Sequence, residues 1–313
     1  MCMKNIGIIG GSGFIGKNLT IFYSEKGYNV KVIERTANKF PIIKKNIEFL
    51  QVNILDTNQL IRSVDCCECI IWLASALVPS TKNESLVNDF EVNTAPLIRF
   101  LEKANSLLFF KKFVYLSSGG TIYGDVNDYK PLDEKTSKHP ISSYGLSKIV
   151  TENYIKFLTL NLPIQSFILR PSNVYGKYQD LLKPQGIIGF AFKAIHNNTS
   201  IDLYNDGKVT RDFVYVADLA NAIDCCFESK FKISETSIYN VGSQKGYTIK
   251  EVLDKIIRVT NRNLNVISKP SRNFDCNYNV LKIDKINKEL NWKPETDFDE
   301  GLKMVWDWIK NEK

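Results

Sequence analysis

The sequence predicts an α/β fold, with a doubly wound parallel sheet and a smaller C-terminal lobe. Short apolar runs alternate with amphipathic stretches through the first half of the chain. A glycine-rich turn joins the first apolar run to the first amphipathic stretch, and the alternation ends near residue 173. Strands that are buried on both faces and separated by helices form parallel sheets with right-handed crossovers.

Each element follows from this alternation. Runs rich in Ile, Val and Phe predict buried strands, and longer stretches with apolar residues on one face predict helices. The expected strands are 5–9, 29–33, 48–52, 69–73, 112–116 and 166–169. The expected helices are 14–26, 60–64, 91–106 and 144–159.

The length predicts more than one structural region. A chain of 313 residues exceeds what one compact core usually holds. Beyond residue 173, Pro, Gly and Asn become frequent and the strands less regular. We therefore expect one domain over residues 1–172, with 212–243 returning to it through a strand at 237–242. The second lobe would comprise 173–211 and 244–313.

Composition excludes several classes of protein. The chain is 44% hydrophobic and 24% charged, as is ordinary for a globular protein. Its net charge of +7 is spread along the sequence, which argues against a nucleic-acid partner. No apolar run is long enough for a membrane, and the first residues turn into glycines too soon for a signal peptide. A cytoplasmic location is expected.

The cysteines do not predict a metal site. There are seven, with Cys66, Cys67 and Cys69 close together and Cys225 next to Cys226, and there are two histidines. This spacing lacks the paired ligand pattern of zinc sites. Reduced thiols and no bound metal are expected, in keeping with a cytosolic protein.

The segment IGIIGGSGFIGKNL predicts a dinucleotide site. It follows the first strand and opens the first helix. Gly10 would let the chain turn tightly, Gly13 would let the backbone approach a pyrophosphate, and Gly16 would let the helix pack closely on the sheet. The phosphates would lie at the helix N-terminus, where free N–H groups favour negative charge. The alternative is a glycine-rich turn that binds nothing.

The second strand ends in an acidic residue. Glu34 stands at about the distance where a carboxylate meets the ribose hydroxyls of the adenosine, and it would repel a 2′-phosphate. NAD is therefore favoured over NADP, although Arg35 and Lys39 could serve a phosphate, and Glu34 could be an ordinary strand-end charge. Other strand ends add expected cofactor contacts, at Asn53, Ile54, Ala74 and Ser75.

SSYGLSK contains a tyrosine and a lysine four residues apart. On a helix capped by Ser142 or Ser143, Tyr144 and Lys148 would share one face. A lysine ammonium and the positive nicotinamide ring would favour the phenolate, so that Tyr144 could act as a general base. Such a pair alone is usually incidental, but here it follows a dinucleotide loop.

The chain resembles the extended short-chain dehydrogenase/reductases, in the NAD-dependent epimerase/dehydratase group. The resemblance covers nearly all of the chain and rests on motifs in the same order. These are GGSGFIG (10–16), Glu34, WLAS (72–75), VN (92–93), SSGGTIYG (117–124), YGLSK (144–148), LRPSNVYG (169–176), RDFVYVADLA (211–220), YNVGS (239–243) and KELNWKP (288–294).

The resemblance implies a Rossmann-type NAD-binding domain with a sugar-nucleotide lobe, and a homodimer formed through two helices of each subunit. It implies that Tyr144 is the catalytic base and that Lys148 is its partner and a ligand of the nicotinamide ribose. It also adds Phe14, Ile15 and Asn93 to the expected NAD contacts.

The resemblance also implies substrate contacts in the second lobe. Asn173 matches a residue that contacts the diphosphate, and Arg211 and Arg272 match two arginines that hold phosphates. Guanidinium groups suit phosphate oxygens; the plainer alternatives are a local Arg211–Asp212 ion pair and a loop charge. Asn279 falls where related glucose/galactose enzymes carry a bulky tyrosine, which would leave room for an N-acetyl group.

One position departs from the family pattern. UDP-galactose 4-epimerases usually carry a Ser or Thr where this chain has Gly119, and that hydroxyl bonds the sugar. Ser118 is the first candidate to replace it and Thr121 the second. A loop built only for turning is the alternative.

The resemblance implies NAD-dependent 4-epimerisation of a sugar nucleotide, with a UDP-linked hexose or N-acetylhexosamine as the expected substrate. The first alternative is an NAD(P)H-dependent 4-keto-sugar-nucleotide reductase, which Arg35 and Lys39 favour and Glu34 disfavours. The second is a non-catalytic dinucleotide-binding protein, which the intact Tyr144 and Lys148 disfavour.

Overall fold

The structure is a computed structural model of the chain. It falls into two compact units, each of which is built from three segments of sequence. Unit 1 contains residues 1–122, 140–170 and 223–239, and unit 2 contains 123–139, 171–222 and 240–313. The described residues are 4–36, 44–75, 86–125, 129–182, 185–230, 232–271 and 276–311.

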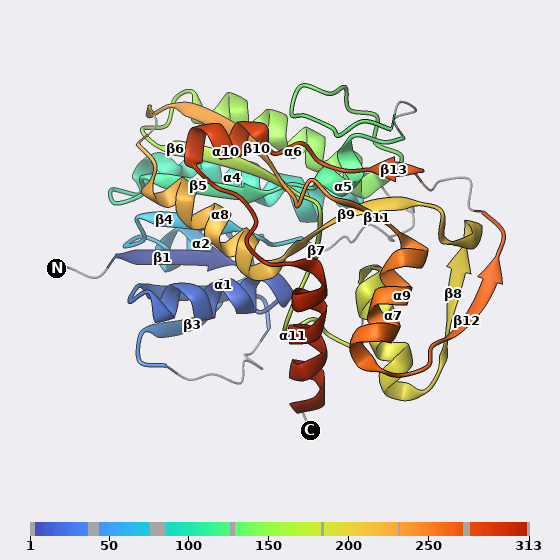
Figure 1. Cartoon of the computed structure of the whole chain (residues 1–313). Helices are drawn as coiled ribbons and strands as arrows, with labels where there is room; N and C mark the ends of the chain where they lie inside the picture. The colour runs from blue at the N-terminus through green and yellow to red at the C-terminus, as the bar shows by residue number, and fades with distance from the viewer. Residues whose placement is uncertain are drawn as a thin grey trace. The chain divides into compact units, whose positions relative to one another are not determined.

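A parallel sheet forms the centre of unit 1 (Figure 1). Its seven strands, among the described residues, run in the order β10-β6-β5-β4-β1-β2-β3, and each neighbouring pair from β3 to β6 is parallel. The order reverses direction at β1, which makes the sheet doubly wound. The strands are β1 (Asn5–Ile9), β2 (Asn29–Glu34), β3 (Ile47–Gln51), β4 (Cys69–Trp72), β5 (Lys112–Leu116), β6 (Gln165–Pro171) and β10 (Glu235–Val241).

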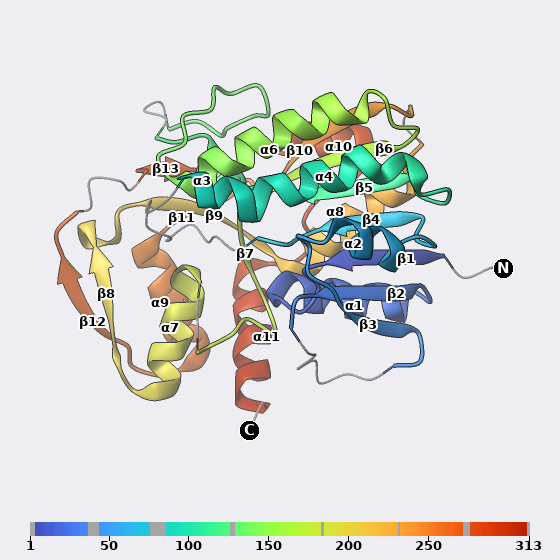
Figure 2. The same cartoon turned by 180° about the vertical axis from the view of Figure 1, so that it is seen from behind.

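Helices cover both faces of this sheet. Helix α1 lies on the face seen in Figure 1, whereas α4 and α6 lie on the face seen in Figure 2. Buried side chains of α4 and α6 join Trp72, Phe113 and Ile168 of the strands in one apolar core. The helices are α1 (Phe14–Glu25), α2 (Thr57–Ser63), α3 (Leu86–Asp89), η1 (Phe90–Thr94), α4 (Ala95–Lys103), η2 (Ala104–Ser106), α5 (Gly119–Ile122), α6 (Ser143–Thr159) and α8 (Val216–Glu228), whose first residues belong to unit 2.

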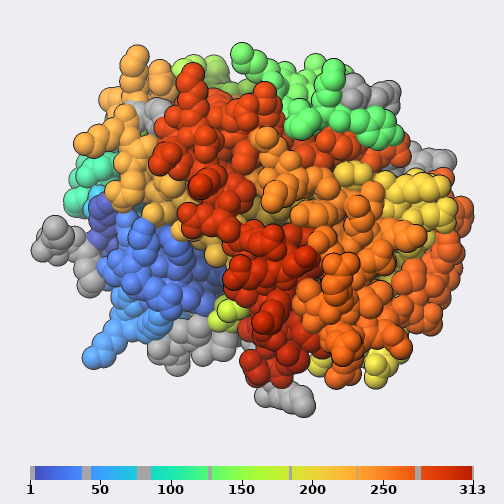
Figure 3. Space-filling model, in the orientation of Figure 1, coloured from blue at the N-terminus to red at the C-terminus, as the bar shows by residue number. Residues whose placement is uncertain are grey.

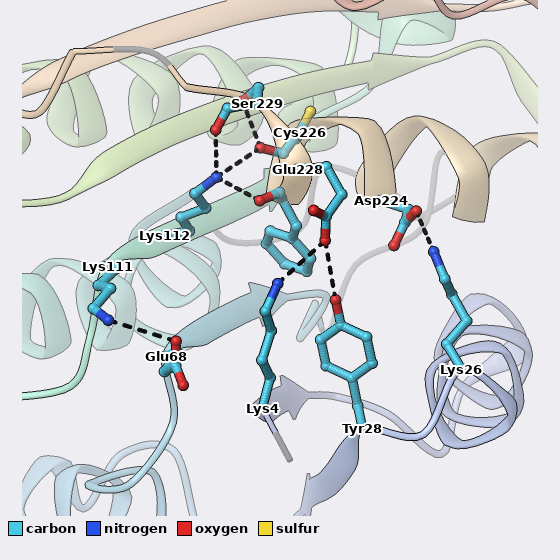
Figure 4. Close-up of polar contacts among 11 residues, drawn as sticks. Lys4, Lys26, Tyr28, Glu68, Lys111, Lys112, Asp224, Cys226, Glu228 and Ser229 are labelled. Carbon is cyan, nitrogen blue, oxygen red and sulfur yellow. Dashed lines mark hydrogen bonds and ion pairs between the residues drawn. The ribbon is translucent and has the colours of Figure 1, made fainter. Parts of the chain in front are cut away.

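Polar contacts fasten the end of α8, which belongs to unit 1, to other elements of the same unit (Figure 4). The Lys26 ammonium lies 2.5 Å from the Asp224 carboxylate. The Lys112 ammonium donates to three backbone carbonyl oxygens at the end of α8, those of Cys226 (3.5 Å), Phe227 (2.5 Å) and Ser229 (2.6 Å). A helix end leaves such carbonyl groups without partners, so a lysine is a suitable cap there.

Unit 2 has its own sheets and core. Strands β11, β9 and β13 are neighbours, β7 pairs with β9, and β12 pairs with β8. Helices α7, α9 and α11 pack around β9, and α9 and α11 lie side by side at the surface in Figure 3. The elements are β7 (Asn173–Tyr175), α7 (Gly186–Asn197), β8 (Ser200–Tyr204), η3 (Asn205–Gly207), β9 (Thr210–Tyr215), β11 (Gly246–Thr248), α9 (Ile249–Thr260), β12 (Asn265–Lys269), β13 (Tyr278–Asn279), α10 (Asp284–Leu290) and α11 (Phe298–Asn311).

The predicted α/β fold class is confirmed, with differences at two helices. Helix α2 begins at Thr57, ahead of the expected start, because the Asp56 carboxylate caps it by accepting from the Gln59 N–H at 3.0 Å. The helix expected over 91–106 is divided into η1, α4 and η2. Pro96 lies in the first turn of α4 and has no N–H to donate to the turn before it.

The cysteines of the described segments are free thiols. The same segments contain no helix with the length and apolar character needed to cross a membrane. The predicted assignment of residues to a cofactor domain and a substrate lobe stays a prediction.

Candidate functional site

The glycine loop after β1 has the geometry of a phosphate cradle. Gly10 has φ +86°, and a Cβ on it would lie 2.7 Å from the backbone nitrogen of Ala74. A Cβ on Gly16 would overlap the backbone of Gly11. At Gly13, by contrast, the one described atom that a Cβ would meet within 4 Å is the Gly10 carbonyl oxygen, at 3.7 Å. Packing within the protein thus requires Gly10 and Gly16, whereas the space at Gly13 suits the approach of a ligand.

Helix α1 directs its N-terminus at this space. The helix starts at Phe14 with Gly13 at its N-cap, which has no side chain to accept from the first N–H groups. The first turn also carries no acidic side chain. Free N–H groups and the helix dipole favour an anion at such a terminus. The loop therefore fits the pyrophosphate of a dinucleotide.

Glu34 lies beside the same loop. Its carboxylate accepts a hydrogen bond from the backbone N–H of Ser12. The Gly10 N–H donates to the Ile33 carbonyl oxygen at 2.9 Å, which fixes the loop to the end of β2. The acid is thus placed where a ribose next to the pyrophosphate would need an acceptor.

The other residues that were predicted at strand ends lie just after β4 and just after β3. Ala74 contacts the loop at Gly10, and the Ser75 hydroxyl lies 3.5 Å from Oδ1 of Asn93. Asn53 follows β3, and its Oδ1 accepts from the Leu55 N–H at 3.1 Å, so this side chain stabilises a turn. Ile54 packs on the apolar core of unit 1. All of them lie at the carboxyl ends of the sheet strands, where ligands of this kind of fold bind.

Tyr144 and Lys148 come together at the start of α6. The Ser142 hydroxyl accepts from the Gly145 N–H at 3.2 Å and caps the helix, which places Tyr144 in its first turn. The Lys148 ammonium lies 5.5 Å from the ring centroid of Tyr144. It also lies 4.7 Å from the ring of Tyr115 and donates to the Leu116 carbonyl oxygen at 2.8 Å. The lysine is therefore held under the tyrosine ring.

Burial moves both groups toward their neutral forms. It raises the pKa of Tyr144 to about 12, while a hydrogen bond with the Ser118 side chain lowers that pKa. It lowers the pKa of Lys148 to about 8, while the charge of Glu152 raises that pKa. An added positive charge near the phenol would reverse the effect of burial on Tyr144.

Ser118 and Thr121 differ in their surroundings. The Ser118 side chain bonds Tyr144, whereas the Thr121 Oγ1 is buried with no hydrogen-bond partner among the described residues. Gly119 is the first residue of the short helix α5. A Cβ on Gly145 would lie 2.7 Å from the Thr121 carbonyl oxygen, so α5 and α6 approach closely there.

In unit 2 the predicted substrate residues gather around β9. The Asn173 side-chain amide donates to the Asp212 carbonyl oxygen at 2.9 Å. Arg211 donates to the carbonyl oxygens of Thr210 (2.9 Å) and Cys276 (2.7 Å). Asn279 is fully buried on β13 and is the register partner of Arg211. Arg272 lies outside the described residues.

Sequence reasoning missed the buried carboxylates. Asp212 accepts from the Ser243 N–H (2.8 Å), the Ser243 hydroxyl (2.7 Å) and the Leu281 N–H (3.1 Å), and burial raises its pKa to about 6. Glu152 forms a fully buried ion pair with Arg170 at 2.6 Å. The arginine within the apolar run of β6 was the available signal, because a buried charge needs a partner.

Comparison with known proteins finds a matching family model and similar proteins. A model of the NAD dependent epimerase/dehydratase family matches residues 6–242. A Methanocaldococcus jannaschii protein, provisionally named UDP-glucose 4-epimerase, is 35% identical over 308 residues, covering 97% of this chain and 98% of the relative. An Escherichia coli dTDP-4-dehydro-6-deoxyglucose reductase is 28% identical over 305 residues, covering 94% of each chain.

Solved structures match over the whole chain. The UDP-glucose 4-epimerase of Thermotoga maritima, solved with UDP-glucose, has a TM-score of 0.90 at 28% identity and covers 98% of each chain. The UDP-glucose 4-epimerase of Thermus thermophilus, solved with NAD, has a TM-score of 0.89 at 28% identity, covering 99% of this chain and 100% of the other.

Proposed function

The chain belongs to the NAD dependent epimerase/dehydratase family, and on that premise we propose that it is a UDP-sugar 4-epimerase. The observation that carries the proposal is the grouping of Tyr144, Lys148 and Ser118 in the same unit as the glycine loop. The predicted family, enzyme class and cofactor are confirmed by the family match and by relatives of the same kind.

The chain's own residues provide a fitting NAD site. The open cradle at Gly13 and the N-terminus of α1 would hold the pyrophosphate, and Glu34 would hold the adenosine ribose. Lys148 would donate to the nicotinamide ribose. When bound, NAD supplies an acceptor and later a donor of hydride for C4 of the sugar.

Tyr144 is the proposed general base and acid, which removes and returns the proton of the sugar 4-hydroxyl. As phenolate it removes the proton of the sugar 4-hydroxyl while C4 loses hydride, and the sugar becomes a 4-ketose. The 4-ketose then rotates within the site, so that hydride returns to the opposite face of C4. Tyr144 gives the proton back to the oxygen on C4. The Lys148 ammonium stabilises the phenolate, and the Ser118 hydroxyl orients the phenol.

Anchoring and chemistry are divided between different parts of the substrate. We propose that Asn173 and Arg211 hold the nucleotide diphosphate, with Arg272 as a further ligand. The fully buried Asn279 is proposed to lie near the sugar's 2-substituent, where a small side chain would admit an N-acetylhexosamine as well as a hexose. Because the anchor binds the diphosphate, which both C4 epimers share, it need not favour one epimer over the other.

A 4-keto-sugar-nucleotide reductase is the second candidate, and the Escherichia coli relative favours it. The position of Glu34 beside the glycine loop opposes it, because a carboxylate there disfavours the 2′-phosphate of NADPH. Of the two residues that would favour a phosphate, Arg35 is exposed just after β2, and Lys39 lies outside the described residues. A reductase would also release its cofactor after each turnover.

One experiment separates the candidates. The purified protein is denatured and its released nucleotide is identified by absorbance and mass. The native protein is then incubated with UDP-glucose, UDP-galactose and the two UDP-N-acetylhexosamines without added cofactor. Released NAD together with interconversion of a 4-epimer pair is expected, and Y144F should keep NAD and lose turnover. An empty protein that acts only on 4-keto sugars with NADPH would refute the proposal.

We further propose that the enzyme is a homodimer. Leu86, Val87 and Phe90 are exposed on α3 and η1, and Tyr154 and Phe157 are exposed on α6. The rings of Phe90 and Tyr154 lie 6.4 Å apart, so these side chains form one apolar face. A second copy of the same face would cover it. F157E should convert a dimer into a monomer in light scattering; a wild-type monomer would refute the proposal.

We also propose a cytoplasmic location, which the free thiols of the described residues support. Nucleotide-activated sugars are charged and water-soluble, and the proposed substrate would meet the enzyme there. Cell fractionation with antibody detection tests this placement, and recovery with the membrane or outside the cell would refute it.

A further inference from the structure

Helix α6 carries a third chemical group in line with the two proposed for catalysis. Tyr144, Lys148 and Glu152 are spaced four residues apart, so they lie in one row along the helix. Lys148 and Glu152 are buried, with exposed fractions of 7% and 1%. The row therefore faces the protein interior next to the end of β5.

Three consecutive residues at the end of β5 and just beyond it each contact one residue of this row. The Leu116 carbonyl oxygen accepts from Lys148 at 2.8 Å. The Ser117 hydroxyl donates to Oε1 of Glu152 at 2.6 Å. The Ser118 side chain bonds Tyr144. Three successive residues thus hold three successive members of the row, which fixes the register of α6 against the strand end.

Arg170 holds the last member of the row from β6. Its Nε donates to Oε1 of Glu152 at 2.9 Å, and its Nη2 donates to Oε2 at 2.6 Å. Both side chains are 1% exposed. A two-pronged guanidinium contact fixes the orientation of a carboxylate as well as its position. Glu152 is therefore held both from β6 and from the residue that follows β5.

Packing does not require an ion pair at this position. Apolar residues of similar volume often replace a buried pair without loss of stability. Helix α6 already has its Ser142 cap and packs Ile155 into the apolar core. The pair stands one helical turn beyond Lys148, and the charge of Glu152 raises the pKa of that lysine. Its position points to a role in the site.

We propose that Glu152, clamped by Arg170 and Ser117, is a positioning residue that holds Lys148 under the ring of Tyr144. Among the described residues, the Tyr144 and Tyr115 rings and the Leu116 carbonyl oxygen contact the Lys148 ammonium, and the Glu152 carboxylate one helical turn away acts on its charge. Glu152 supplies the only carboxylate among these groups. The inference rests on the proposed role of Tyr144 as the base.

The test compares two variants with a matched control in the NAD-loaded enzyme. E152Q keeps the shape of the side chain and removes its charge. The double variant E152L/R170L removes both members of the pair, so that neither of them is left buried without the other. D224N is the control, because it removes the acidic partner of another ion pair in unit 1, that with Lys26. Turnover and KM with the UDP-sugar pair, NAD content and thermal midpoint are measured for each.

A positioning role predicts a specific pattern. Both variants should lose turnover by on the order of 10- to 100-fold with KM changed less than about threefold, because only the catalytic geometry is disturbed. D224N should keep the wild-type rate. Loss of the Glu152 charge lowers the pKa of Lys148, so the acid limb of the pH–rate profile should move to higher pH in E152Q. A lower thermal midpoint together with an unchanged turnover rate and an unchanged acid limb of the pH–rate profile would overturn the proposal.

A second readout needs no sugar substrate. Ionisation of Tyr144 is followed by its phenolate absorbance in NAD-loaded protein, with Y144F subtracted. The phenol should titrate at higher pH in E152Q and in the double variant than in the wild type, and an unchanged titration would overturn the inference. If the wild type fails to interconvert UDP-sugars while the titration still shifts, the proposed function fails and the positioning role stands.

Discussion

Replacement of Lys148 by methionine tests the electrostatics of the proposed base most directly. Methionine has a similar length and no charge, so K148M removes the ammonium that lies 5.5 Å from the Tyr144 ring centroid. The pKa of Lys148 is about 8, so at pH 7 most of the lysine in the wild-type site carries its charge. The substitution therefore removes a charge that is present under ordinary assay conditions.

The size of the effect follows from this distance. A unit charge 5.5 Å from a phenolate, with the ring centroid taken as its position, contributes about 3 kcal/mol at an effective dielectric constant of about 20. That energy corresponds to about two pKa units. Burial raises the pKa of Tyr144 to about 12 in this site even with the hydrogen bond from Ser118, which lowers that pKa, so the phenolate depends on nearby positive charges. K148M should raise the pKa of the phenol by about two units.

The assay is a pH–rate profile of UDP-sugar epimerisation by NAD-loaded enzyme. Below the phenol pKa the rate is proportional to the phenolate fraction, so K148M should turn over about 100-fold more slowly there. Its acid limb should lie about two pH units higher, and the rate should recover in part at high pH. K148R is the matched control, since arginine keeps a positive charge throughout this range.

A different outcome would refute this reasoning. If K148M lowers the rate equally at every pH and the acid limb stays in place, the lysine acts through binding and not through its charge. NAD content of each variant must be measured in parallel, because Lys148 is also expected to contact the nicotinamide ribose. A loss of NAD that accounts for the whole loss of rate would lead to the same conclusion.

Three further predictions concern other contacts. Burial raises the pKa of Asp212 from 3.8 to about 6, so the folded state binds more protons than the unfolded state between these values. The free energy of unfolding should therefore fall by about 2 kcal/mol as pH rises from 4 to 6, and D212N should lose this dependence in urea unfolding. K112M removes the lysine that caps the end of α8 and should lower the free energy of unfolding by about 1–3 kcal/mol in urea unfolding. An unchanged free energy of unfolding would show that the helix end does not need Lys112. S118A removes the hydrogen bond to Tyr144 and should reduce turnover by about tenfold; a larger loss in T121A would show that Thr121 is the assisting hydroxyl.

The sequence by itself determined the elements and the local chemistry of the cofactor loop. Apolar runs and glycine positions depend on nearest neighbours in the chain, and the parallel sheet with its loop at β1 follows from them. The spacing of Tyr144 and Lys148 could also be interpreted directly, because a helix places residues four apart on one face. Asp56 also caps α2 through a local contact, so the start of that helix could have been predicted from the sequence in the same way, but it was not.

The tertiary structure decided which distant groups meet. Ser117 and Glu152 are far apart in sequence, and so are Asp212 and Leu281, yet each pair shares a hydrogen bond. The register of a helix against a strand end results from side-chain packing across the sheet, which leaves no periodic signal in the sequence. A buried carboxylate looks like any surface acid until its partners are seen, because burial and pairing are properties of the folded chain alone.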